Sequence, residues 1–366
     1  MISPILSNKT LKKIKNLFPI EPNDKIYFPI INNPINLENL LKLFSNKIVV
    51  SVPNYTLYSK ILKNQFITKE FSKNKIEFNM DFFGVSSKIS FENITKTIVI
   101  FPSNLSLNLI NYALHQMINL LTQPAAFLII TSHKKQSEIV VKWMDETRLD
   151  YSKTKSHDKI LFFIPKFTPS NINKSDFEDY IFKINHKKDF GEFEFFSSDG
   201  VFSKDKIDDG TDFLIETILN EALISKDAEI IDYFAGIGVI GIILSKFLEL
   251  KKLHCIESDL ISLFLLKRNL KYHQIDNSIV HAMDGLVDPN IIPNSIDYII
   301  ANPPTHIKKE DFKTFLHLSR QLLKNQGKLL IVINSIIPYE HTLKEYFPNP
   351  SNIIIYQKNK YKIIVS

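Results

Sequence analysis

The chain has 366 residues, a formal net charge of +6, 44% hydrophobic residues and 23% charged residues. This length exceeds what one hydrophobic core usually supports, so two domains are expected, and the composition excludes a disordered or fibrous chain. The mild positive charge suits a polyanionic partner without requiring one.

The cysteine count and the lengths of the apolar runs exclude several structural features. Cys255 is the only cysteine, which excludes an internal disulfide and a cysteine cluster for structural zinc. The sequence contains neither an apolar run of about 18 residues nor a signal-peptide pattern. We therefore expect a cytoplasmic, monomeric protein without a metal ion or a membrane span.

Residues 1–165 alternate short apolar runs with helical patterns, which predicts an α/β domain with a mostly parallel sheet. The predicted strands are Lys47–Val52, Ile76–Met80, Thr97–Phe101, Ala126–Thr131 and Lys159–Ile164, and the predicted helices are Leu37–Phe44, Leu107–Leu121 and Gln136–Glu146. Of nine glycines only Gly84 precedes residue 190, so this half has no glycine-rich ligand loop. We interpret it as a scaffold or partner-binding domain rather than a second active site.

Residues 166–184 are predicted to contain a linker and the start of a β-hairpin, and residues 185–366 a second domain. The hairpin is expected from Tyr180–Asn185 and Glu192–Ser198, followed by a loop and a helix at Phe213–Ile224 that Thr211 is expected to cap. Seven strands should follow, with helical segments between the first five and an antiparallel hairpin at the end. They are Glu229–Phe234, Leu253–Glu257, Ile279–Met283, Ile296–Ala301, Lys328–Asn334, Asn352–Tyr356 and Tyr361–Val365.

A glycine-rich loop follows the first of these strands. The strand ends near Asp232, and Gly236, Gly238 and Gly241 follow in the spacing G-x-G-x-x-G before a helical pattern. Glycines at these positions allow a tight turn, a close approach of the backbone to a ligand and close packing of helix on strand. By itself this spacing is also compatible with an ordinary strand-to-helix turn.

Two acidic residues follow the next two strands. Glu257 ends the second strand, where a carboxylate can accept hydrogen bonds from ribose hydroxyls. Asp284 follows the third strand, where a carboxylate can meet the amino group of an adenine. Together with the glycine loop they favour a ligand that contains adenosine.

The fourth strand is followed by Asn302, Pro303 and Pro304. The prolines fix the backbone, so that the Asn302 amide oxygen and the Pro303 carbonyl can point at one spot. Two convergent acceptors suit a planar NH2 group and therefore the methylation of an exocyclic or amide nitrogen.

These motifs make residues 185–366 resemble the bacterial ribosomal RNA small subunit methyltransferase C family. The similar segments are Gly200–Thr211, Asp232–Gly241, Asn302–His306, Asn334–Tyr339 and Lys360–Ile363. The resemblance implies two tandem Rossmann-like class I methyltransferase domains. The first, residues 1–165, is implied to have lost its cofactor site and to support folding and RNA binding. The resemblance further implies S-adenosylmethionine as cofactor, guanine-N2 methylation of 16S ribosomal RNA, and the small ribosomal subunit or its RNA as partner.

The resemblance also assigns roles to residues. Catalysis falls to Asn302, Pro303 and Pro304. Cofactor binding falls to Phe202, Ser203, Asp208, Gly210, Thr211, Asp232, Gly236, Gly238, Gly241, Glu257, Asp284 and Asn302. Thr305 and His306 are expected at the substrate, but Thr305 stands where the family pattern has an aromatic residue that stacks on the base, and Tyr339 is a candidate substitute.

Three alternatives stay open at this point. A sister family with the same layout methylates the large-subunit RNA, and another planar NH2, such as a glutamine amide or adenine N6, also fits the pattern. The third is a non-catalytic RNA-binding or assembly protein that retains the fold.

Overall fold

The computed structural model describes residues 6–31, 33–82, 94–103, 105–120, 126–155, 160–165, 176–285, 291–305, 307–337, 339–347 and 353–366. By its internal contacts the chain divides into two compact units, residues 1–181 with 198–200, and residues 182–197 with 201–366. The predicted linker falls partly on residues 166–175, outside the described ranges, so the predicted boundaries at 165 and 185 stay predictions.

The first unit contains a seven-stranded sheet with the order β3-β2-β1-β4-β5-β7-β6. The strands are β1 (Ile26–Phe28), β2 (Ile48–Val52), β3 (Ile76–Met80), β4 (Lys96–Ile100), β5 (Ala126–Thr131), β6 (Tyr151–Lys155) and β7 (Leu161–Pro165). The first five run parallel, whereas β7 is antiparallel to both β5 and β6. Strands buried on both faces explain the continuous apolar runs of the sequence.

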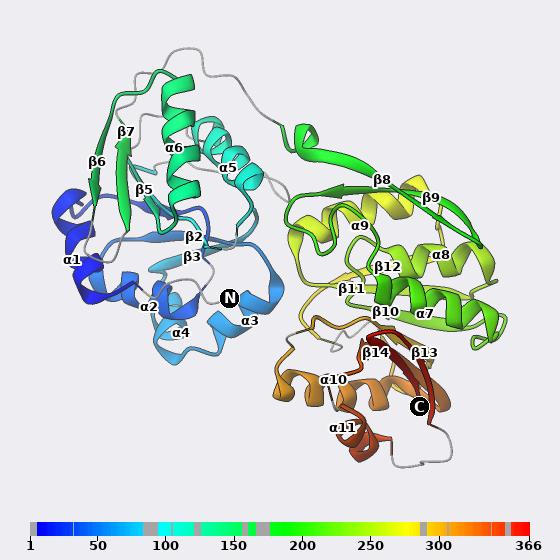
Figure 1. Cartoon of the computed structure of the whole chain (residues 1–366). Helices are drawn as coiled ribbons and strands as arrows, with labels where there is room; N and C mark the ends of the chain where they lie inside the picture. Colours follow the sequence, from blue (N-terminus) through cyan, green and yellow to red (C-terminus); the bar gives the residue numbers. More distant parts are fainter. Residues whose placement is uncertain are drawn as a thin grey trace. The chain divides into compact units, whose positions relative to one another are not determined.

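Helices cover both faces of this sheet (Figure 1). They are α1 (Asn8–Leu17), α2 (Pro34–Leu43), α3 (Tyr55–Leu62), α4 (Gln65–Ser72), α5 (Leu107–Leu120), α6 (Lys134–Glu146) and the short 3-10 helix η1 (Phe177–Tyr180). One apolar core joins α1 to α4 with the strands, and α5 and α6 pack together. Among the described elements of this unit, α1, α3, α4, η1, β1 and β6 were not predicted.

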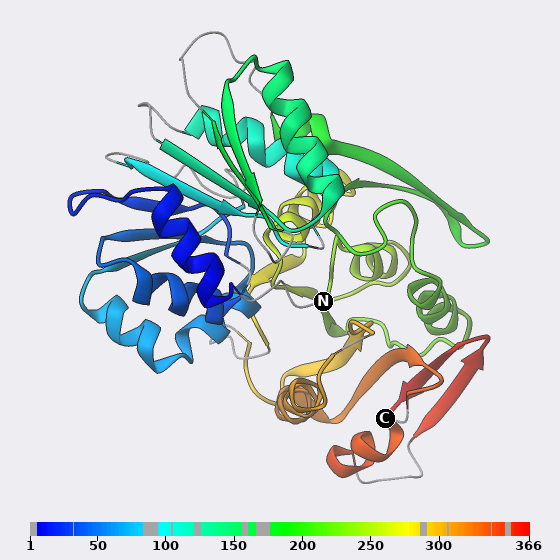
Figure 2. The same cartoon turned by 60° about the vertical axis from the view of Figure 1, so that its left-hand side comes forward.

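The second unit begins with a hairpin of β8 (Ile181–Lys188) and β9 (Gly191–Ser198). Its main sheet has the order β12-β11-β10-β13-β14-β16-β15, the same pattern as the first unit. The strands are β10 (Glu229–Tyr233), β11 (Lys252–Glu257), β12 (Ser278–Ala282), β13 (Ile296–Ala301), β14 (Leu323–Asn334), β15 (Ile354–Lys358) and β16 (Tyr361–Val365). The predicted fold class is confirmed, with two seven-stranded, mostly parallel sheets, the second ending in an antiparallel hairpin, coloured red in Figure 2.

Five helices flank the second sheet. They are α7 (Asp209–Asn220), α8 (Val239–Phe247), α9 (Leu260–Tyr272), α10 (Lys309–Leu322) and α11 (Tyr339–Tyr346). The helices α7 to α9 pack on one face, and α10 and α11 enclose an apolar core on the other. The helical segment expected between β12 and β13 is absent from the described residues 284–285 and 291–295.

Candidate functional site

The glycine loop joins β10 to α8, and its three glycines meet different requirements. Gly236 has a φ of +57°, and a Cβ placed on it would have no atom within 4 Å. A Cβ on Gly238 would lie 2.6 Å from Leu266 Cδ1, and one on Gly241 would lie 2.9 Å from Leu253 Cδ2. Gly238 and Gly241 therefore serve packing, whereas Gly236 leaves open space for a ligand.

The side chain of Asp232 is hydrogen-bonded to the backbone of the glycine loop. Its side chain is fully buried in β10, and its Oδ2 accepts a 2.9 Å hydrogen bond from the Gly241 amide. Burial raises the pKa of Asp232 to about 7, because a carboxylate loses hydration in an apolar interior. We therefore assign Asp232 to holding the loop.

Glu257 lies at the carboxyl end of β11, next to the loop. Its Oε2 accepts from the Gly236 amide at 2.8 Å, and its Oε1 accepts from the Ser258 and Asp259 amides at 2.7 and 2.8 Å. Burial raises the pKa of Glu257 to about 7, although these backbone donors favour the ionised form. A carboxylate fixed beside Gly236 is an acceptor in the right place for sugar hydroxyls.

The carboxyl end of β12 adds a second open position. Asp284 follows this strand, and the next residue, Gly285, has a φ of +99° and no atom within 4 Å of a Cβ placed on it. Because β12, β11 and β10 are parallel neighbours, Asp284, Glu257 and the glycine loop lie along one edge of the sheet. This is the edge where ligands bind in open α/β sheets.

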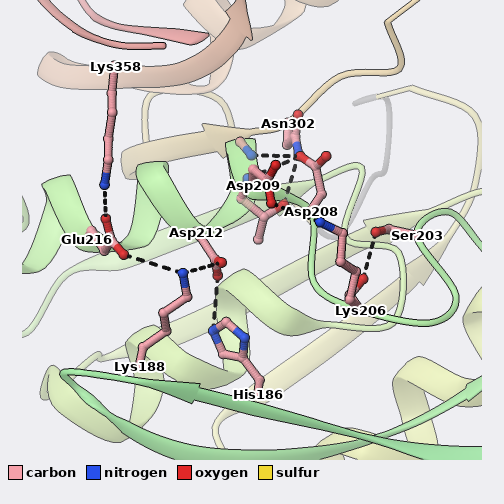
Figure 3. A network of polar contacts seen from close by, with 12 residues as sticks. His186, Lys188, Ser203, Lys206, Asp208, Asp209, Asp212, Glu216, Asn302 and Lys358 are labelled. Atoms are coloured by element: carbon pink, nitrogen blue, oxygen red, sulfur yellow. Dashed lines mark hydrogen bonds and ion pairs between the residues drawn. The ribbon is translucent and has the colours of Figure 1, made fainter. Parts of the chain in front are cut away.

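Asn302 follows β13, the strand that pairs with β10 on its other side. Its Nδ2 donates to Asp208 Oδ2 at 3.1 Å (Figure 3). The same Nδ2 donates to Thr211 Oγ1 at 2.8 Å. Pro303 is buried, and Pro304 and Thr305 are exposed. His306 lies outside the described residues.

The loop before α7 supplies the two partners of Asn302. Asp208, and not Thr211 as expected, caps α7, because its Oδ2 accepts from the Gly210 and Thr211 amides at 3.0 and 3.2 Å. Thr211 instead lies in the first turn of α7, where its hydroxyl contacts Asn302. Phe202 is 71% exposed, and Ser203 Oγ donates to the Lys206 carbonyl at 2.6 Å. The structure thus brings Asp208 and Thr211 to Asn302 and leaves Phe202 exposed.

A network of charges ties α7 to two hairpins (Figure 3). Asp212 lies 3.0 Å from His186 Nε2 and 2.8 Å from Lys188 Nζ, both in β8. Glu216 lies 3.7 Å from Lys188 and 2.8 Å from Lys358 of β15. Burial acts to raise the pKa of Asp212, but the contacts with His186 and Lys188 outweigh it and hold that pKa below its ordinary value. The network therefore fixes the helix that carries Asp208 and Thr211.

Sequence reasoning missed two residues of this region. Asn269 is fully buried in α9 and donates through Nδ2 to the carbonyl of Ile237 in the glycine loop at 2.9 Å, while its Oδ1 accepts from the Phe196 amide at 2.8 Å. Tyr361 of β16 places its hydroxyl 3.4 Å from Asp208 Oδ1. An asparagine on the apolar face of α9 was a detectable signal, whereas nothing in the sequence pairs Tyr361 with Asp208.

Tyr339, the candidate substitute for the aromatic residue absent at Thr305, is engaged in packing. Its ring stacks on Phe312 with centroids 4.2 Å apart, and its hydroxyl donates to the Ile307 carbonyl at 3.3 Å.

No cluster of three or more His, Cys, Asp or Glu side chains suited to a metal ion occurs within the described residues. Among the helices of the described ranges, none has the length and apolar character needed to cross a bilayer.

Comparison with known proteins finds a family model that matches most of the second unit. Residues 192–365 match the family model of the methyltransferase small domain. This part of the chain is therefore similar to the methyltransferase small domain. The glycine loop, Glu257 and Asn302 all lie within it.

Curated relatives carry a more specific name. Ribosomal RNA small subunit methyltransferase C of Shewanella denitrificans is 30% identical over 168 residues, which are 45% of this chain and 46% of that protein. The protein of the same name from Haemophilus influenzae (strain PittGG) is 30% identical over 172 residues, 46% of this chain and 49% of its own length. The chain thus spans about half the length of the curated relatives it matches. These relatives confirm the resemblance that the motifs of residues 185–366 predicted.

A solved structure extends the likeness in fold to both units. The 16S rRNA N2 methyltransferase of T. thermophilus (RsmC), solved with AdoMet and guanosine, superposes with a TM-score of 0.73 at 16% identity and covers 100% of this chain and 93% of its own. The fold of both units is therefore similar to that of this solved structure.

Proposed function

We propose that this chain transfers a methyl group from S-adenosylmethionine to the exocyclic N2 amine of a guanosine in 16S ribosomal RNA. The observation that carries the proposal is the orientation of Asn302. Both hydrogen bonds found for its amide leave from Nδ2, so Oδ1 is directed away from Asp208 and Thr211. An amide oxygen presented at the carboxyl end of β13 is an acceptor for a substrate NH2 group.

The residues at the edge of the sheet fit the proposed cofactor. The open position at Gly236 accommodates a ligand against the backbone, and Glu257 supplies a fixed acceptor for ribose hydroxyls. The open position at Gly285 gives room beside Asp284 for the adenine. When bound, the cofactor supplies a methyl group that its sulfonium has already activated.

The chain's own contribution is binding and orientation. Asn302 Oδ1 and the Pro303 carbonyl accept hydrogen bonds from the amine and direct its lone pair toward the methyl group. The rate increase then comes from proximity and orientation of the two reactants. The base must be swung out of any helix, because an amine inside a base-paired stack is beyond reach. The chain's own residues therefore supply neither a nucleophile nor a metal ligand in this proposal.

The choice of ribosomal RNA rests on the relatives named for small-subunit methylation and on the net charge of +6. The first unit repeats the strand order of the second without a glycine loop, which suits a role in holding RNA. We further propose that the protein is a monomer and acts in the cytoplasm, where ribosomes assemble.

The test is mass spectrometry of ribosomal RNA from cells that lack the gene. We expect one N2-methylguanosine to disappear from 16S RNA and to return with the wild-type gene but not with Asn302→Ala. A loss from 23S RNA instead would assign the chain to the sister activity.

One observation favours a second candidate, a non-catalytic RNA-binding or assembly protein. Thr305 offers no stacking face, and Tyr339 is held against Phe312. Unchanged methylation of all ribosomal RNA in the deletion strain, together with a defect in subunit assembly, would support this candidate.

A further inference from the structure

We propose that Thr211, Asp208 and Tyr361 are positioning residues that lock the Asn302 amide with its oxygen toward the substrate, and so select a nitrogen that carries hydrogens. This inference rests on the proposed function and assigns Asp208 and Thr211 to Asn302, not to the methionine end of the cofactor.

The two partners of Asn302 determine which way its amide faces. Asn302 Nδ2 lies 3.1 Å from Asp208 Oδ2, and this carboxylate oxygen, which accepts hydrogen bonds, favours the amide nitrogen over the amide oxygen at this place. The second Nδ2 hydrogen is directed at Thr211 Oγ1, 2.8 Å away. Turning the amide over would place its oxygen against the carboxylate. The flipped amide is therefore disfavoured.

The Asp208 side chain also contacts two backbone amides of α7 and the hydroxyl of Tyr361. Its Oδ2 caps α7 through the Gly210 and Thr211 amides, which fixes the carboxylate to the helix. The Tyr361 hydroxyl lies 3.4 Å from Oδ1, and the Tyr361 ring covers Gly210, where a Cβ would lie 2.9 Å from the ring. The terminal strand β16 thereby supports the first turn of α7.

The rest of α7 is anchored independently of Asn302. Asp212 and Glu216 bind His186, Lys188 and Lys358, which belong to β8 and β15. The first turn of α7 is therefore a rigid support, and the loss of one hydroxyl from it should not move the helix.

The two hydrogen bonds from Asn302 Nδ2 to Asp208 and Thr211, which we call the lock, affect which substrate atom can be bound. A fixed Oδ1 accepts from a substrate NH2 group, whereas a carbonyl or an unprotonated ring nitrogen at the same place would meet oxygen lone pairs. Released from Thr211 and Asp208, the amide could turn its own NH2 outward. We therefore expect loss of the lock to reduce the rate of methyl transfer without weakening cofactor binding.

The experiment compares Thr211→Val with Thr211→Ser. Valine is similar in shape to threonine but cannot accept the hydrogen bond, and serine keeps the hydroxyl. Single-turnover methylation of small ribosomal subunits from the deletion strain should slow about tenfold in Thr211→Val and by less than about threefold in Thr211→Ser. The dissociation constant of S-adenosylmethionine should stay within about twofold of the wild-type value in both variants.

A second measurement does not depend on activity. The side-chain amide signals of Asn302 in a 15N–1H spectrum, assigned by their absence in Asn302→Ala, should shift in Thr211→Val and stay in place in Thr211→Ser. Tyr361→Phe should shift them less, because it acts through Asp208.

The possible outcomes separate the two proposals. If the wild-type protein binds cofactor but methylates no ribosomal substrate, while Thr211→Val shows the expected amide shifts, the proposed function is removed and the lock is kept. Full activity and unshifted amide signals in Thr211→Val would overturn the lock. Loss of cofactor binding in Thr211→Val would also overturn it, because Thr211 would then be a cofactor ligand.

Discussion

The two sheets have the same strand order, yet their strand ends carry different chemistry. In the first unit β1 has three residues and runs into Pro29, whereas its counterpart β10 has five and runs into the glycine loop. After β4 the chain reads Phe101-Pro102, and after its counterpart β13 it reads Asn302-Pro303-Pro304. The two units thus share a strand order, but the glycine loop and the Asn-Pro-Pro sequence follow strands of the second unit alone.

In the first unit, hydrogen bonds within the protein involve residues of β1 and β2 and the residue that follows Phe101 after β4. Tyr27 of β1 and Ser51 of β2 are buried and hydrogen-bonded to each other at 2.9 Å, and burial raises the pKa of Tyr27 above its ordinary range. The Pro102 carbonyl accepts from Gln136 Nε2 at 2.7 Å. In the second unit the corresponding strand ends carry Glu257 and Asn302, which we propose as acceptors for ligands.

The largest effect is expected at Gly236. In Gly236→Val the side chain would enter the open position and strain a backbone with φ +57°, so cofactor affinity should fall by about 100-fold or more. Calorimetric titration with S-adenosylmethionine measures the cofactor affinity of the variant and of the wild type. The matched control is Gly191→Val, which strains a turn with φ +136° in the β8–β9 hairpin and should leave cofactor affinity intact. Wild-type affinity in a folded Gly236→Val protein would remove the site from this loop.

Asn302→Ala should have the next largest effect. It removes the acceptor that orients the amine, so kcat should fall by about 100-fold or more, with little change in cofactor affinity. Single-turnover kinetics on small ribosomal subunits separate the two quantities. Full activity of the variant would rule out the proposed mechanism.

A smaller effect is expected from pH through Glu257. Its pKa is raised to about 7 by burial, so the carboxylate that accepts the ribose hydroxyls is ionised above that pH and becomes protonated below it. Cofactor affinity should therefore be highest near pH 8 and fall as pH decreases, by about tenfold one unit below the pKa. Glu257→Gln should bind more weakly at pH 8 and lose this slope. An equal slope in Glu257→Gln would assign the pH dependence to another group.

The smallest effect is expected at Thr305. An aromatic ring at this exposed position would add a stacking face worth about 1 to 3 kcal/mol, so Thr305→Phe should tighten RNA binding or raise turnover by about fivefold or more. Thr305→Val is the matched control, since it changes the side chain without adding a ring. If phenylalanine and valine behave alike, the base is stacked elsewhere.

The sequence predicted the second unit better than the first for physical reasons. Long apolar runs and glycines made β10, β11 and β13 evident, whereas β1 has three residues and β6 is the polar edge strand Tyr-Ser-Lys-Thr-Lys. The residues at strand ends were predictable, because the carboxyl ends of parallel strands meet at one edge.

Contacts between distant segments were not predictable. Asp208 and Tyr361 are 153 positions apart, and the partners of Asn302 depend on where the first turn of α7 lies against β13. Thr211 was expected as a helix cap, and the structure places Asp208 there because Asp208 precedes the first helical residue. Such pairings follow from packing and not from local sequence.

The comparison of the two units is tested most directly by the number of cofactor molecules that one chain binds. Calorimetric titration of the wild-type protein with S-adenosylmethionine should give one equivalent per chain, bound by the second unit. Two equivalents would show that the first unit kept a site despite its strand ends, and none would show that the glycine loop, Glu257 and Asn302 do not form one.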